Sequence, residues 1–126
     1  HGDESVEVCS RLMPRVIKVI RVKDRTSLLP IQHYNENVRA ILLDTWSAEA
    51  RGGTGRGFDW DLAVEAKQFG IPIVLSGGLK PANIKEAIAR VKPVAVDVNS
   101  GVEARAGKKS LALLEQFFNE IRGYGG

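Results

Sequence analysis

The segment Arg39-Ala-Ile-Leu-Leu43 is a short apolar run, and it stops abruptly at a carboxylate, Asp44. Three further runs of the same kind occur at residues 16–22, 72–75 and 93–98. All four are short and rich in β-branched residues, which is typical of the fully buried strands of a parallel sheet. The sequence therefore predicts four parallel strands.

Helical segments separate these predicted strands. Gly70 suits the left-handed end of one helix, and Pro81 suits the first turn of the next, where its missing N–H costs nothing. Alternating strands and helices indicate an α/β fold built from parallel βα units, and no linker divides residues 1–126 into separate domains. The predicted helices cover residues 5–13, 29–37, 59–69, 82–91 and 110–121.

Composition narrows the class of protein. The 126 residues include 18 Lys and Arg against 15 Asp and Glu, a formal net charge of +3. The basic residues are scattered rather than gathered in a stripe, so we expect no nucleic-acid partner. The single cysteine, Cys9, excludes an internal disulfide framework and a structural zinc site, and it favours a reducing, cytoplasmic location. No apolar run approaches the roughly 18 residues that span a bilayer, so no membrane partner is expected.

Glycine and polar residues collect where the predicted strands end. Gly77 and Gly78 follow the third strand, and Ser100 and Gly101 follow the fourth. Ligands of βα folds bind at the carboxyl ends of strands, and glycine leaves backbone N–H groups open to a phosphate. We therefore expect a phosphate site here, completed by an extra helical turn at residues 102–107.

Two nucleotide-binding patterns fail in detail. Residues 101–110 resemble a P-loop, but their glycines are one residue too far apart and a second Lys precedes the Ser. Residues 52–57 do not complete the dinucleotide-binding glycine pattern. A nucleotide fold is therefore disfavoured.

The motifs ILLDT, GGTGRGFDW, VLSGGLKPANI and AVDVNSGVE, followed by GKK, occur in order between His1 and Lys109. Together they closely resemble the phosphoribosylanthranilate isomerase family of tryptophan biosynthesis. The resemblance implies a (β/α)₈ barrel that rearranges N-(5-phosphoribosyl)anthranilate from an aldose-type to a ketose-type aminosugar, without a cofactor or metal.

The resemblance also indicates what this sequence lacks. The family's general base is a cysteine in a Lys-Ile-Cys-Gly motif, and no segment matches that motif; Cys9 lies in a different, helical context. Four strands account for only the C-terminal half of the barrel, its strands five to eight. The chain begins with His1 rather than Met, so it is either processed or a piece of something longer. We expect a single partial domain that needs the missing N-terminal half, or a second copy, to cover its open edges.

The resemblance implies a role for each candidate residue, and each has a simpler alternative. Asp44 matches the general acid, since a carboxyl at the end of an apolar strand can keep its proton when desolvated; the alternative is a loop cap. Asp97 matches a carboxylate near the substrate amine, or makes a structural hydrogen bond. The phosphate-binding residues, whose alternative is turn chemistry alone, are Gly77, Gly78, Ser100 and Gly101.

Three further residues are expected to border the substrate. Gly52 and Gly53 belong to the glycine-rich motif, which is alternatively a plain flexible loop, and His1 matches the family's His-Gly. A different class of function also stays open. In that alternative the chain is a non-catalytic half-barrel that binds phosphosugar or phosphate, or that associates with itself as a scaffold.

Overall fold

The structure is a computed structural model, and it describes residues 1–44 and 56–122. Its centre is a parallel sheet in which spatial order follows sequence order, β1-β2-β3-β4. The predicted α/β fold with parallel strands is confirmed. The strands are β1 (Ile17–Arg21), β2 (Ala40–Asp44), β3 (Ile73–Ser76) and β4 (Ala95–Val96).

Four of the five predicted helices are found at the expected places: α1 (Val6–Leu12), α3 (Arg56–Ala66) continued by the 3₁₀ turn η2 (Lys67–Phe69), α4 (Pro81–Val91) and α5 (Leu111–Ile121). Gly70 ends η2 with φ +75°, and Pro81 is the first residue of α4, both as predicted. No described helix is long and apolar enough to cross a membrane.

The segment predicted as a helix at residues 29–37 is different. It is a 3₁₀ helix, η1 (Arg25–Tyr34), which begins earlier and contains Pro30. Asp24 caps its start by accepting a hydrogen bond from Thr26 N (2.9 Å). In an α-helix the proline ring would clash with the carbonyl group four residues earlier, which disfavours an α-helix through this position.

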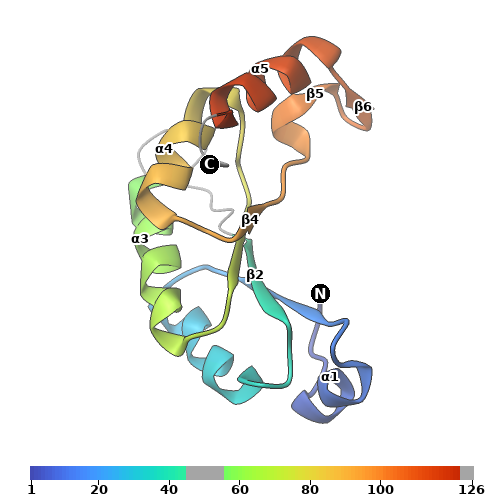
Figure 1. Ribbon diagram of the computed structural model, residues 1–126, viewed down its shortest axis with the longest axis vertical. Helices are drawn as coiled ribbons and strands as arrows, with labels where there is room; N and C mark the ends of the chain where they lie inside the picture. Colours follow the sequence, from blue (N-terminus) through green and yellow to red (C-terminus); the bar gives the residue numbers. More distant parts are fainter. Residues whose placement is uncertain (45–55, 123–126) are drawn as a thin grey trace.

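The helices cover one face of the sheet. Figure 1 shows α3 and α4 side by side along the strands, with α1 at one end of the molecule and the β5–β6 hairpin near the other. Ile41 and Leu43 of β2 are fully buried, whereas Leu42 and Asp44 are half-buried. Because side chains alternate along a strand, one face is packed and the other carries Asp44.

The expectation of four fully buried strands is wrong for the outer two. Ile17 of β1 is 49% exposed, and Ala95 of β4 is also exposed. The strand order puts β1 and β4 at the edges of the sheet, so neither is enclosed as β2 and β3 are.

The extra helical turn expected at residues 102–107 is also wrong. An antiparallel hairpin of β5 (Glu103–Arg105) and β6 (Lys108–Lys109) occupies this stretch, and Gly107 turns it with φ +80°. The short helical turn comes earlier, as the 3₁₀ helix η3 (Ser100–Val102).

Candidate active site

Polar side chains form a row across the carboxyl ends of the strands. In the sheet register, Asp44 of β2 is paired with Arg21 of β1 on one side and with Ser76 of β3 on the other. Partners in a parallel register lie on the same face, and strands are about 4.8 Å apart. Arg21, Asp44 and Ser76 therefore line one edge of the face that carries Asp44.

Asp97 extends this row. Its backbone N–H donates to the carbonyl of Leu75 (2.9 Å), so pairing with β3 continues beyond the two residues of β4. Ser76 Oγ donates to Asp97 Oδ2 at 3.3 Å. Asp97 directly follows β4, and its carboxylate is exposed. The hydrogen bond from Ser76 is the structural partner that such an aspartate was expected to need.

The loops after β3 and β4 are pressed against each other. A Cβ atom on Gly101 would lie 1.7 Å from the carbonyl oxygen of Leu79, so only glycine fits there. Gly77 and Gly78 adopt φ +90° and +67°, in the left-handed region that glycine favours. The structure thus brings together the two loops that carry Gly77, Gly78, Ser100 and Gly101.

A buried asparagine holds the first of these loops. Asn83 of α4 is 2% exposed, accepts a hydrogen bond from Lys80 N (2.9 Å) and donates one to Gly78 O (2.9 Å). Its side chain therefore ties the glycine turn to the first turn of the helix. This arrangement, with a helix beginning directly after a glycine turn, suits an anion.

The hairpin holds the second loop. Lys109 Nζ donates to the carbonyl oxygen of Asn99 (3.2 Å), to the Asn99 side chain, and to Glu103 Oε2 (3.1 Å). Ser110 N donates to Val102 O at 2.8 Å, which joins the far end of the hairpin to η3. The ammonium group adds a positive charge beside the loop.

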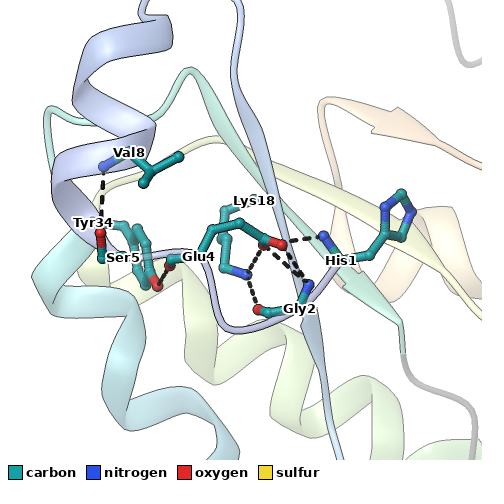
Figure 2. A network of polar contacts seen from close by, with 7 residues as sticks. All are labelled: His1, Gly2, Glu4, Ser5, Val8, Lys18 and Tyr34. Atoms are coloured by element: carbon teal, nitrogen blue, oxygen red, sulfur yellow. Dashed lines mark hydrogen bonds and ion pairs between the residues drawn. The ribbon is translucent and has the colours of Figure 1, made fainter.

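His1 lies outside this arrangement. Its imidazole is 93% exposed and, as Figure 2 shows, points away from the contacts made by its own backbone amine and by Gly2. The amine pairs with Glu4 Oε1 at 3.3 Å. The structure therefore does not bury His1 against Asp44 or Asp97.

Gly52 and Gly53 fall outside the described residues, so their predicted place beside the substrate has no structural test. Among residues 1–44 and 56–122, no group of three or more His, Cys, Asp or Glu side chains is arranged to hold a metal ion. Cys9 is buried in α1 and is a free thiol.

Several residues of this region escaped prediction. Arg21 stood one place before the end of an apolar run, and its pairing with Asp44 follows only from the register. Asn83 had a usable signal, because an asparagine three residues after a helix cap position is well placed to bind back to that cap. Lys109 carried no such sequence signal, because its contacts form only in the folded hairpin.

Comparison with known proteins places the chain in a family. The model for "N-(5'phosphoribosyl)anthranilate (PRA) isomerase" matches residues 1–120. The N-(5'-phosphoribosyl)anthranilate isomerase of Geobacter sulfurreducens is 51% identical over 124 residues, 98% of this chain and 60% of that protein. The same enzyme of Aquifex aeolicus is 46% identical over 123 residues, 97% of this chain and 59% of that protein. This chain thus spans about 60% of the length of these curated relatives.

Solved structures of the same family also resemble this chain. The phosphoribosyl anthranilate isomerase of Thermotoga maritima is 40% identical with a TM-score of 0.81, covering 98% of this chain and 60% of that one. A phosphoribosyl anthranilate isomerase in complex with reduced 1-(o-carboxyphenylamino)-1-deoxyribulose 5-phosphate is 36% identical with a TM-score of 0.78, covering 98% and 57%. With this fold, and with a sequence match over nearly its full length, the chain belongs to the PRA isomerase family.

Proposed function

We propose that this chain forms the acid- and phosphate-binding part of a PRA isomerase. In this proposal residues 1–126 are a single partial domain, equivalent to strands five to eight of a (β/α)₈ barrel. The four parallel strands, with β1 and β4 at open edges, and relatives of greater length support it. The reaction is the aldose-to-ketose rearrangement of N-(5-phosphoribosyl)anthranilate in tryptophan biosynthesis.

The proposal rests on one observation: Asp44 and the two glycine loops lie at the same edge of the sheet, where the strands end. Asp44 and the two glycine loops follow neighbouring strands, so a carboxyl group and an anion site lie roughly 5–10 Å apart, one to two strand spacings. A ribose 5-phosphate is of comparable length. The relative that was solved with a reduced deoxyribulose 5-phosphate compound supports a phosphorylated ligand here.

In the proposed mechanism, Asp44 gives a proton to the ribose ring oxygen. The bond between that oxygen and C1 breaks, and the nitrogen lone pair forms a C=N⁺ bond. A base then removes the proton from C2, and the resulting enolamine tautomerises to the ketose. Asp97 lies near the substrate amine, and Gly77, Gly78, Ser100 and Gly101 hold the phosphate.

The base is not assigned to this chain. Cys9, its one cysteine, is 3% exposed within α1, a helix at one end of the molecule (Figure 1) and not a strand of the row. We infer that the base is supplied by residues outside this sequence, and that Gly52, Gly53 and His1 border the substrate in the completed site.

Reconstitution tests the proposal. The chain is assayed for loss of substrate fluorescence, alone and after addition of an N-terminal half taken from a relative. We expect turnover only in the second case. Turnover by the chain alone at the rate of a complete enzyme would contradict the assignment of the base.

The acid is tested by Asp44→Asn in the reconstituted enzyme. Loss of a general acid lowers kcat by about 10²–10⁴-fold, and we expect little change in KM. Asp61→Asn, which makes the same charge change at an exposed position of α3, is the control. A kcat within tenfold of the parent would remove Asp44 from the mechanism.

A second candidate, self-association, is favoured by one observation. Ile17 on the edge strand β1 is 49% exposed, and Val94 beside β4 is 67% exposed. Unpaired strand edges and apolar side chains promote pairing between chains. Sedimentation of the purified chain decides this point: a dimer or larger species supports a scaffold, and a stable monomer rejects it.

A further inference from the structure

Lys18 is a charged residue in a place where the fold calls for an apolar one. It is the second residue of β1 and is only 4% exposed. Among the described residues, the buried polar or charged side chains are Lys18 and Asn83. Burying an ammonium is costly unless it is paired and hydrogen-bonded, so its partners should explain why it is there.

Those partners come from the chain before α1. As Figure 2 shows, the Lys18 ammonium donates to the carbonyl oxygen of Gly2 and to Glu4 Oε1, the latter at 2.9 Å. It also lies 5.8 Å from the centre of the Tyr34 ring, within range of a cation–π contact. The ammonium thus has two oxygen acceptors and an aromatic face as its neighbours.

The same partners are joined to one another. Tyr34 OH donates to Glu4 O (2.7 Å), and Gly2 N donates to Glu4 Oε1 and Oε2 (3.0 and 3.1 Å). Residues 1–5 have no regular secondary structure. Their place beside β1 therefore depends on this set of contacts, which we call the Lys18 cluster: Gly2, Glu4, Lys18 and Tyr34.

The contacts of the cluster favour the charged form of Glu4. The hydrogen bond from Lys18, followed by that from Gly2 N and the chain's terminal amine, lowers the pKa of Glu4 from 4.5 to about 2. The carboxylate is nevertheless 44% exposed. It can return to water when its partner is removed, so the cluster fixes a position more than it supports the core.

We propose that Lys18 is a positioning residue, whose buried ammonium fastens the segment from His1 to Glu4 to β1 and, in the completed site of the proposed function, sets where His1 meets the substrate. Gly2, whose carbonyl Lys18 binds, directly follows His1 in the chain. The inference rests on the proposed function for its effect on catalysis, but the fastening itself is a property of this chain alone.

Lys18→Met tests the fastening in the isolated chain. Methionine fills the space of the lysine stem, so we expect the melting temperature to change little. Amide hydrogen exchange of a peptide covering residues 2–12 should become about tenfold faster, with residues 73–91 unchanged. The pKa of Glu4, followed by carbon NMR, should rise from about 2 toward 4.5. Lys85→Met, at an exposed position of α4, is the matched control and should change neither.

Glu4→Gln covers the case in which Lys18→Met does not fold. Its amide oxygen can still accept from the buried Lys18 ammonium, while the charge that strengthens this hydrogen bond is removed. Exchange in residues 2–12 should again accelerate. Unchanged exchange in this variant overturns the proposal. So does a general acceleration that includes residues 73–91, because Lys18 would then support the whole fold.

The catalytic consequence is measured in the reconstituted enzyme. A displaced substrate contact predicts a rise in KM of about tenfold for Lys18→Met with a smaller change in kcat, and partial recovery in Lys18→Arg, which keeps the cation. A fall in kcat with constant KM rejects the positioning role. If the parent itself shows no turnover, the proposed function fails, while the exchange and Glu4 measurements still decide the role of Lys18.

Discussion

The loops after β3 and β4 and the segment before α1 are held in place by opposite means. Gly101 packs directly on the backbone of Leu79, and Asn83 binds the glycine turn from a buried position. The Lys18 cluster instead depends on charge, with Glu4 half in water. Backbone contact gives a fixed pair of loops that tolerates no added atom at Gly101, whereas a charged cluster gives a fastening that responds to pH.

Gly101→Ala should have the largest effect, on the packing of the loops after β3 and β4. The new methyl carbon would lie 1.7 Å from Leu79 O, and relief requires one of the two loops to move. We expect a loss of about 3 kcal/mol or more in the free energy of unfolding, measured with urea.

Gly78→Ala is the matched comparison, because its Cβ meets no atom within 4 Å and only the φ of +67° is unfavourable. A cost of about 1–2 kcal/mol is expected there. Equal losses in the two variants would contradict the packing argument.

Asn83→Ala should come next. The variant leaves Lys80 N and Gly78 O without the partner that each has at 2.9 Å, and we expect a loss of about 2–3 kcal/mol. Asn83→Asp keeps the acceptor for Lys80 N but cannot donate to Gly78 O when ionised. Thermal unfolding of both variants at neutral pH checks this: an alanine variant as stable as the parent would show that the loop does not need Asn83.

The fold was predictable where one local rule decided it. Short apolar runs fixed the four parallel strands, and Gly70 and Pro81 marked a helix end and a helix start. The failures have physical causes. Pro30 blocks an α-helix within η1, and the turn at Gly107 favours a hairpin over the expected helical turn. The exposure of β1 and β4 depends on strand order, which no local pattern contains.

The candidate site likewise contains residues that could be predicted from the sequence and residues that could not. The residues next to a strand end, such as Asp44 and Gly78, could be read from sequence because all strands of a parallel sheet end at one edge. The Lys18 cluster could not, because its contacts join residues 14, 16 and 30 positions apart. The sequence shows a lysine in an apolar run, and only the folded chain shows which carbonyl and carboxylate it binds.

The helix caps of the two regions offer a smaller comparison. Ser110 Oγ accepts from Leu113 N at 3.2 Å and lies beside the hairpin, whereas Ser5 Oγ accepts from Val8 N at 3.4 Å at an exposed position. We expect Ser110→Ala to cost about 1 kcal/mol and Ser5→Ala about 0.5 kcal/mol. Urea unfolding of the two variants checks the order, and a larger cost at Ser5 would show that the segment before α1 supports the core after all.

We rank the response of the Lys18 cluster to acid last, because Glu4 is exposed and water screens its ion pair with Lys18. The pKa of Glu4 in the folded chain, about 2, is below its ordinary value of 4.5, because Lys18 and Gly2 N bind the charged form. The stabilisation from Glu4 is therefore complete above about pH 4.5 and is lost as the pH falls toward 2.

Since Glu7 and Asp24 also have lowered pKa values, the quantity to measure is the difference in the free energy of unfolding between the parent and Glu4→Gln. That difference should be constant from pH 7 to 5 and shrink steadily between pH 4.5 and 2, with Glu86→Gln of α4 as the control. A difference that persists at pH 2 would mean that Glu4 acts through its shape and its neutral hydrogen bonds, and the contrast with the backbone packing of Gly101 on Leu79 would disappear.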